Sequence, residues 1–428
     1  MSSSWTKTGL LLGALAAVAL SVLPAGGAGA SVAHSAVVND NPANYTPNVE
    51  ADAAVAKPAV HALKQLGGTM YAGGRFRSVS DSTRTTTYVR HNLMSFSATT
   101  GALTSFDPAF DGTVWAIEAS GSSLYVGGDF KTVNGVARKK LVKLDAVTGE
   151  VDQTFKPSIK SGNVTEIRLV SGRLLVGGKL PGRLLALDPD TGADTGYIGL
   201  PITGSVADNA GPTKVYKFAV NPAGTRLVAL GNFTSVGGTQ RWQAFMLDLG
   251  PSTATLNPWS YQPLQNLCSA RSIPAYLRDV DFSPDGTYFV FVSSGYVPRS
   301  GGVGRDICDA TARFETSVAQ PNRPTWINYT GGDTLHSVAI TGAAVYVQGH
   351  QRWLDNPLGR DSAGPGAVSR PGIGAIDPTL GTALAWNPTK TRSVGGKDLY
   401  ATSAGLWVGS DGQRFAREYR ARIAFCPL

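Results

Sequence analysis

The chain has 428 residues, a formal net charge of +8, 51 glycines and only 16% charged residues. No long charged or helix-forming tract occurs, which excludes a long-helix protein and favours many short strands joined by tight turns. The basic balance favours anionic partners such as acidic polymers or membrane surfaces, and does not choose among them.

Residues 1–30 are predicted to be a signal peptide. Lys7 precedes an apolar run from Leu10 to Leu23, and Ala28-Gly29-Ala30 offers a small-x-small cleavage site. Cleavage as late as residue 36 also fits the sequence. The apolar run is short for a membrane span. We therefore expect a secreted protein, extracellular or associated with the cell wall, without a transmembrane span after signal removal.

A repeated motif follows the N-terminal segment of residues 37–59. The clear copies are Met70-Tyr-Ala-Gly-Gly-Arg-Phe76, Leu124-Tyr-Val-Gly-Gly-Asp-Phe130 and Leu174-Leu-Val-Gly-Gly-Lys-Leu180, and four weaker copies begin at Leu227, Phe289, Val345 and Leu406. Gly74, Gly128 and Gly178 are separated by steps of 54 and 50 residues. A period near 50 built only of strands is typical of β-propeller blades, so residues 60–428 are predicted to form propeller repeats.

Each unit contains four strand-like pieces with alternating apolar residues, and the third and fourth are joined by a turn such as Val147-Thr-Gly149. The seventh unit ends after its third strand, at Arg422 to Leu428. Residues 44–49 resemble the missing fourth strand, since Tyr45-Thr-Pro47 matches Phe106-Asp-Pro108. The prediction is an all-β, seven-bladed propeller closed by an N-terminal strand that completes the last blade; a disordered N-terminal tail is the alternative.

The register also places the three cysteines. Cys268 precedes the first strand of the fifth unit and Cys308 begins its third strand, so both are expected at one rim and are candidates for a disulfide. Cys426 aligns with the apolar positions Leu144 and Leu247. It is therefore expected to be a buried small hydrophobic residue.

The repeat resembles the delta-60-type tandem β-propeller repeat of secreted bacterial proteins, particularly actinobacterial ones. The resemblance is carried by residues 124–157, "LYVGGDFKTVNGVARKKLVKLDAVTGEVDQTFKP", and by the other copies. It implies a propeller in an extracellular protein of unassigned biochemical activity. It brings no catalytic residues that can be transferred to this chain.

The glycine pairs do not predict a nucleotide site, because a phosphate loop needs a helix after its glycines, and here another strand follows. The turn motif resembles the tryptophan-docking repeats of quinoprotein dehydrogenases, but of the corresponding positions only Trp386 keeps the tryptophan. The five histidines show no metal spacing. We expect neither a metal nor a cofactor.

Several carboxylates fall in first strands, nearest the predicted channel. They are Glu118, Glu166, Asp279, Asp281 and Asp398. A glycosidase needs two carboxylates about 5–10 Å apart, and different blades could supply them. Structural acids are the simpler interpretation, so enzymatic activity stays uncertain and a non-enzyme is favoured.

Charge is predicted to segregate between the two faces. The loops from second to third strands are rich in arginine and lysine, whereas the turns from third to fourth strands hold Asp145, Glu150, Asp188 and Asp377. Five arginines recur at one position of the repeat, where backbone carbonyls are their expected partners: Arg90, Arg138, Arg241, Arg370 and Arg420. The other basic loop residues are candidates for binding, among them Lys139, Lys140, Arg352 and Arg360.

A second aligned set begins the first strands on the same rim. It consists of His61, Trp115, Thr165, Tyr216, Arg278, His336 and Lys397. Aromatic, cationic and imidazole groups together could hold an acidic sugar or another anion at the channel mouth, while packing of the channel is the simpler alternative.

The function expected from the sequence is a secreted, monomeric binding module for anionic extracellular material, such as an acidic glycan or a cell-wall polymer, on the basic rim. No specific nucleic-acid partner is expected. A carbohydrate-active enzyme that uses the channel carboxylates and a platform that binds surface proteins are the alternatives.

Overall fold

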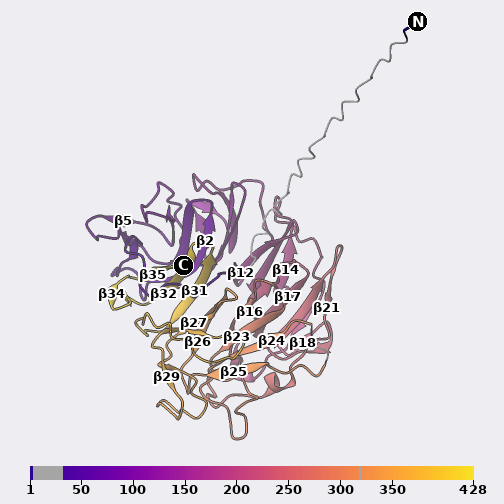
Figure 1. Cartoon of the computed structure of the whole chain (residues 1–428). Coiled ribbons are helices and arrows are strands. Elements are labelled where there is room, and N and C mark those ends of the chain that lie inside the picture. The colour runs from indigo at the N-terminus through magenta and orange to yellow at the C-terminus, as the bar shows by residue number, and fades with distance from the viewer. Residues whose placement is uncertain (3–31, 318–319) are drawn as a thin grey trace.

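A computed structural model describes residues 1–2, 32–317 and 320–428 (Figure 1). These residues form an all-β protein of antiparallel strands, with two short 3-10 helices at Asp208–Ala210 and Gln262–Gln265. The all-β prediction is therefore confirmed. No helix within the described ranges is long and apolar enough to cross a membrane. Most of the predicted signal peptide, including its cleavage site at Ala30, lies outside the described residues.

Each repeat unit forms its own sheet, in which strands that are consecutive in the repeat are hydrogen-bonded neighbours. The sheets are β2 (Ala59–Leu66), β3 (Thr69–Arg75) and β6 (Leu93–Ser97); β7 (Val114–Ser120), β8 (Ser123–Gly128) and β11 (Leu141–Asp145); β12 (Asn163–Val170), β13 (Arg173–Lys179) and β14 (Leu184–Leu187); β16 (Lys214–Val220), β17 (Arg226–Asn232), β20 (Ala244–Leu249) and β21 (Ala254–Leu256); β22 (Leu277–Phe282), β23 (Tyr288–Ser293), β24 (Ala310–Glu315) and β25 (Trp326–Tyr329); β26 (Leu335–Ile340), β27 (Val345–Gly349) and β30 (Ile373–Ile376); and β31 (Gly396–Thr402), β32 (Gly405–Ser410) and β35 (Ile423–Pro427).

The predicted fourth strand is regular only in the sheets that end with β21 and β25. In four other sheets a single bridge stands in its place, as between Phe96 and Leu103 or between Leu144 and Val151, and among the described residues no strand or bridge pairs with β35 on its outer side. The outer pieces of these units carry prolines, such as Pro108 and Pro157. Because proline has no N–H group to donate, it shortens the outer ladder.

Short hairpins occur in several of the loops between second and third strands. They pair β4 (Ser78–Ser80) with β5 (Thr87–Val89) and with β1 (Asn48–Val49), β9 (Thr132–Val133) with β10 (Val136–Ala137), β18 (Ser235–Val236) with β15 (Ile202–Thr203) and β19 (Thr239–Gln240), β28 (Trp353–Leu354) with β29 (Val368–Ser369), and β33 (Arg414–Phe415) with β34 (Glu418–Tyr419).

The first strands of the sheets lie side by side around a common centre, each in contact with the next in sequence. β2 contacts β7, β12 contacts β7 and β16, β22 contacts β16 and β26, and β31 contacts both β26 and β2. Apolar clusters fill the space between neighbouring sheets, as where Tyr71 and Leu93 pack with Val114 and Ile117. The core is thus divided among the interfaces between sheets.

The glycine pairs permit this close packing. A Cβ atom on Gly73 would lie 2.4 Å from Cγ1 of Val114 in the next sheet, and one on Gly127 would lie 2.4 Å from Cγ1 of Val164. A Cβ atom on the second glycine, Gly128, would lie 2.2 Å from the backbone oxygen of Thr113 in its own sheet. Both glycines therefore serve close approach of the backbone, as expected from the sequence.

The N-terminal segment runs alongside the last sheet. The backbone N–H groups of Asn39 and Ala43 donate to the carbonyls of Pro427 (2.7 Å) and Phe425 (2.8 Å) in β35. The Val49 N–H donates to the carbonyl of Ala421 at 3.0 Å. Within the predicted strand 44–49, only residues 48–49 form a regular strand, β1, and it pairs with β4.

Candidate functional site: the channel mouth

A β-bulge interrupts the first strand of every sheet near its start. In β2 the pairing with β3 passes from Val60 to Ala62 and skips His61. The residues skipped in the other sheets are Trp115, Thr165, Tyr216, Arg278, His336 and Lys397. A bulge leaves one residue unpaired and redirects its side chain. The bulged residues are the aligned set that the sequence singled out.

These side chains meet in one pocket of about 200 Å³ at the centre of the molecule. Its lining consists of His61, Trp115, Thr165, Tyr216, Lys217, Arg278, His336, Gly396 and Lys397. The structure thus brings together all seven aligned positions, in what we call the mouth pocket. Sequence reasoning missed Lys217, which directly follows Tyr216. Because a bulge breaks the alternation of a strand, two successive residues can face the channel.

Aromatic rings form one wall of the mouth pocket. The ring centroids of His61 and Trp115 are 4.2 Å apart. The Lys214 ammonium lies 4.5 Å from the centroid of Tyr216, and the Arg278 guanidinium lies 5.8 Å from the same centroid. Such cation–π contacts hold the charged groups against apolar rings without neutralising them.

The mouth pocket concentrates positive charge. Lys217, Arg278 and Lys397 line it, and no carboxylate does. Burial and the charges of Lys397, Arg75 and Lys217 lower the pKa of His61 to about 3. Burial lowers the pKa of Arg278, and burial together with Arg75 lowers that of Lys397. A depressed pKa on a cation means that its charge is poorly compensated, which suits an anionic ligand.

A second cavity of about 140 Å³ lies further along the channel, and it also borders Trp115 and Lys217. Its charged side chains come from the position after a bulge or from two residues further on, and we call this space the inner cavity. The charged residues of its lining are Lys64, Glu166, Arg168, Lys217, Asp279, Asp281 and Asp398. Four of the five predicted channel carboxylates therefore lie here.

Two of the predicted carboxylates are neutralised by cations. Glu118 pairs with Lys64, with 2.5 Å between Oε1 and Nζ. Glu166 pairs with Arg168 and, at 2.6 Å, with the Lys217 ammonium. Burial opposes the charged form of Lys217, but the charges of Glu166, Asp279 and Asp398 outweigh it and raise the pKa of Lys217.

The aspartates of the inner cavity bond mainly to backbone. Asp279 accepts the Val338 N–H at 3.1 Å, Asp281 accepts the Ile340 N–H at 2.8 Å, and Asp398 accepts the Leu63 N–H at 2.6 Å. Each bond links one sheet to the first strand of the next. Burial raises the pKa of Asp279 to about 7 and that of Asp398 to about 6, although Lys217 opposes both shifts.

The recurring arginines have a structural role, as predicted. Arg90 donates to the carbonyl of Thr104 at 3.0 Å, Arg241 to that of Asn257 at 3.3 Å, and Arg370 to that of Leu384. Arg138 and Arg420 each donate to the carbonyl of the preceding residue. The bonds of Arg90, Arg241 and Arg370 fasten the start of the third strand to the outer segment of the same sheet.

The acidic residues in the turns from third to fourth strands also have local bonding partners. The Oδ1 atom of Asp145 accepts the backbone N–H groups of Val147 and Thr148. Asp188 and Asp377 accept the corresponding amides of their own turns. These carboxylates stabilise the turns between third and fourth strands.

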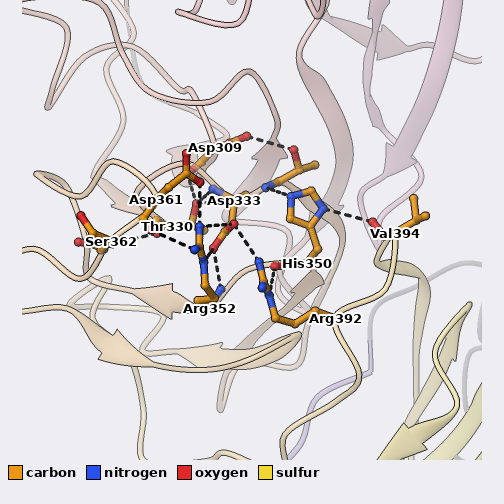
Figure 2. A network of polar contacts seen from close by, with 11 residues as sticks. Asp309, Thr330, Asp333, His350, Arg352, Asp361, Ser362, Arg392 and Val394 are labelled. Carbon is orange, nitrogen blue, oxygen red and sulfur yellow. Dashed lines mark hydrogen bonds and ion pairs between the residues drawn. The ribbon is translucent and has the colours of Figure 1, made fainter.

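Arg352, a predicted binding residue, lies in a polar network beside the mouth pocket (Figure 2). Its Nε donates to Oδ2 of Asp333 at 2.8 Å, and its Nη2 donates to Oδ1 of Asp361 at 2.8 Å. Arg392 also donates to Asp333, at 3.1 Å, and to the carbonyl of His350. The guanidinium of Arg352 is thus engaged in holding two loops together.

His350 links this network to the mouth pocket. Its Nε2 accepts the Thr334 N–H at 3.2 Å, and its Nδ1 lies 3.3 Å from the carbonyl of Val394 (Figure 2). The centroid of its ring lies 6.2 Å from that of His336. The network therefore supports one wall of the pocket.

The remaining candidates lie away from the mouth pocket lining. Lys139 and Arg360 are exposed. The Lys140 ammonium donates to the carbonyl of Asp129 at 2.6 Å, and the residue has a positive φ of 70°. These three residues belong to the surrounding loops, and the structure does not bring them together with the aligned set.

The predicted disulfide is confirmed. Cys268 and Cys308 are bonded, with 5.7 Å between their Cα atoms. Cys426 is a free, buried cysteine, and burial raises the pKa of its thiol. It packs among apolar residues of the last two sheets, as its alignment predicted.

A match to one protein family agrees with this all-β architecture. A family model described as a β-propeller domain of unknown function, DUF5122, matches residues 123–155. Among solved structures, the computationally designed Ika8 protein is similar at 10% identity and a TM-score of 0.46, over 87% of this chain and 98% of that one. No curated protein matches. The matched segment spans the second repeat, so the chain contains a repeat of a β-propeller family.

Proposed function

We propose that the repeat sheets form a seven-bladed β-propeller of the delta-60 type, closed by the N-terminal segment. The contact between β31 and β2 and the hydrogen bonds from residues 39–49 to the last sheet support this. Deleting residues 37–59 should lower the melting temperature sharply, because it removes these bonds and the fully buried Val49. An unchanged melting temperature would contradict closure.

We also propose that the protein is secreted. The signal-like residues 1–30 and the disulfide between Cys268 and Cys308 support export to an oxidising compartment. Expression of the full chain should release into the medium a form that begins between residues 31 and 37, as measured by mass spectrometry. Retention of the intact N-terminus inside the cells would contradict this proposal.

The proposed activity is binding of anionic extracellular material, such as an acidic glycan or cell-wall polymer, with one acidic unit held in the mouth pocket. The observation that carries this proposal is the pocket lining, in which Arg278 and Lys397 stand beside aromatic rings and no carboxylate takes part; Lys217 also lines the pocket but is paired with Glu166. The charges of Arg278 and Lys397 favour an anion, and the face of Trp115 offers a stacking surface for a sugar ring.

Retention on acidic polysaccharide and on purified cell walls tests this activity. The wild-type protein should be retained at low salt and released as salt rises. The double variant R278E/K397E should lose most of this retention, while R323E, at an exposed position away from the pocket, should keep it. If the wild type is not retained on any polyanion at low salt, or if both variants behave alike, the proposal fails.

A carbohydrate-active enzyme is a second candidate, favoured by one observation. Asp279, with its pKa raised to about 7, lines the inner cavity together with Glu166, which forms ion pairs with Arg168 and Lys217. A protonated and an ionised carboxylate are the pair that glycoside hydrolysis uses. Turnover in a glycan panel that disappears in Asp279→Asn would establish this candidate; turnover that persists in Asp279→Asn would exclude this pair.

A further inference from the structure

The charges of the mouth pocket and of the inner cavity have opposite signs. The mouth pocket lining carries Arg278, Lys397 and Lys217 and no carboxylate, and Lys217 is paired with Glu166 of the inner cavity. Around the inner cavity, five carboxylates face three cations when Glu118, the partner of Lys64, is counted. Because Trp115 and Lys217 border both cavities, the two spaces adjoin along the channel.

Two of the five carboxylates take part in no ion pair within the described residues. Among the described residues, Glu118 and Glu166 have ion-pair partners, whereas neither Asp279 nor Asp398 has a cation within 4.0 Å. Each of these aspartates bonds one backbone amide through Oδ2. A carboxylate in a buried channel without a paired cation is unfavourable, and an ammonium group beside it removes this penalty.

The mouth pocket has its own unsatisfied group. His61 is only 9% exposed, and its Nε2 atom has no hydrogen-bond partner in the described protein. The neighbouring Arg278 forms no ion pair among those residues, and Lys397 lies 3.9 Å from its nearest acidic partner, Asp411. The pocket thus holds a buried polar atom without a hydrogen-bond partner, an arginine without an ion-pair partner and a lysine whose ion pair is long, among the described residues.

We propose that the two cavities form one site for a small zwitterion, with its acidic group between Arg278 and Lys397 and its ammonium group between Asp279 and Asp398. Each residue of the first layer is followed directly in sequence by one of the second, so the layers differ by about 3.3 Å along the strands, plus the reach of the side chains. A short aliphatic or sugar skeleton spans such a separation. An amino acid whose two charges lie several bonds apart, or an amino sugar with a carboxylate, has this chemistry.

This inference rests on the proposed anion binding at the mouth pocket and adds the second charge of the ligand. Three probes of equal length separate the two claims by isothermal titration at pH 8: δ-aminovalerate carries both charges, valerate only the carboxylate and pentylamine only the ammonium. δ-Aminovalerate should bind at least about tenfold more tightly than either control. The single-charge probes leave one end of the channel uncompensated.

Two variants test which residues hold the ammonium end and which hold the carboxylate end of the ligand. Asp398→Asn should remove the preference for δ-aminovalerate over valerate without weakening valerate, and Asp190→Asn, at an exposed turn, should keep that preference. Arg278→Gln should weaken both carboxylate probes, while Arg323→Gln should not. Circular dichroism and melting temperature confirm that each variant is folded.

The outcomes distinguish the two proposals. Equal affinities for valerate and δ-aminovalerate would overturn the zwitterion site and leave anion binding at the mouth standing. Equal affinities for pentylamine and δ-aminovalerate would show that the mouth cations contribute nothing, and would overturn both. If none of the probes binds, the zwitterion site is excluded, and retention on polyanions decides the proposed function separately.

Discussion

Two sets of residues recur once per repeat, and they differ in the way they recur. At one position the same residue is repeated, as in Arg90, Arg138 and Arg241, and its guanidinium donates to backbone carbonyls within its own sheet. At the bulge of the first strand the residue changes from sheet to sheet, from histidine to tryptophan, tyrosine, arginine or lysine. The residue that is constant across the repeats thus bonds the scaffold. The residues at the bulge vary from sheet to sheet, which fits the ligand site proposed above.

One of the two sheets without the recurring arginine supports this view. The arginine stands two residues before a position with positive φ, such as Asn92 (70°). In the fifth sheet the corresponding residue is Ile307, which precedes Cys308 and Asp309 (43°). The disulfide of Cys308 thus fastens the sheet where the arginine is absent.

Loss of that disulfide should give the largest effect. Replacing both Cys268 and Cys308 with serine should lower the free energy of unfolding by about 4 kcal/mol, from loop closure over a separation of 40 residues. Denaturant unfolding with and without a reductant measures this. The double variant should be insensitive to the reductant; a wild type equally insensitive under fully reducing conditions would contradict the prediction.

The scaffold should also be intolerant at the glycine pairs. Gly127→Ala should cost about 3 kcal/mol of unfolding free energy, because its Cβ would overlap Val164 in the adjacent sheet. Gly68→Ala provides the control, since no atom lies within 4 Å of its Cβ position. Equal stabilities of the two variants in urea would show that the sheets are packed less closely than described.

Removing one recurring arginine should have a moderate effect. Arg90→Ala loses the bond to Thr104 and should lower the free energy of unfolding by about 2 kcal/mol, without changing ligand binding. Arg77→Ala, at an exposed position in the same loop, should change it by less than about 0.5 kcal/mol. If the Arg90 variant were as stable as the wild type, the recurring arginines could not be distinguished from the bulged residues by a role in stability.

Replacing a cation at a bulge should affect ligand binding and not stability, the reverse of replacing a recurring arginine. Lys397→Gln should leave the free energy of unfolding within about 1 kcal/mol of the wild type or raise it, because it removes a poorly compensated charge. The same variant should weaken retention on polyanions. A loss of stability as large as that of Arg90→Ala would indicate that Lys397 belongs to the scaffold.

The smallest effect concerns the pH dependence of stability. Because the pKa of His61 is lowered to about 3, the folded state keeps this imidazole neutral while the unfolded chain binds a proton below about 6.5. His61 therefore lowers stability as the pH falls from about 6.5 towards 3. His61→Phe should reduce this loss between pH 7 and pH 5, and His91→Phe should not. Parallel curves for wild type and His61→Phe would contradict the shift.

The fold and the aligned set could be derived from the sequence because both depend on local periodicity. The repeat period fixed the position of every first strand, and alignment of those strands brought His61 and His336, 275 positions apart, to equivalent sites. The disulfide followed from the same register. The sequence pattern was sufficient to predict which residues lie close together wherever their positions follow from the repeat.

The remainder depends on contacts that the repeat does not determine. The bulges were not visible in the alternation, so the side chain of Lys217 was not expected in the mouth pocket. Arg352 was expected to be available for a ligand, yet Asp333 and Asp361 bond it from neighbouring loops of variable length. Pairing between such loops is set by their three-dimensional course, for which the sequence carries no periodic signal.

The hydrogen bonds of the N-terminal segment have a consequence for the order of folding. The side chain of Asn48 accepts the N–H of Ala421, a residue 373 positions further along the chain. During synthesis, this hydrogen bond cannot form until Ala421 has emerged from the ribosome, whereas β1 can pair with β4 much earlier. Contacts of such long sequence separation form late. In a nascent chain the N-terminal segment can therefore pair with β4 early, but its bonds to the last sheet form only after that sheet has been synthesised.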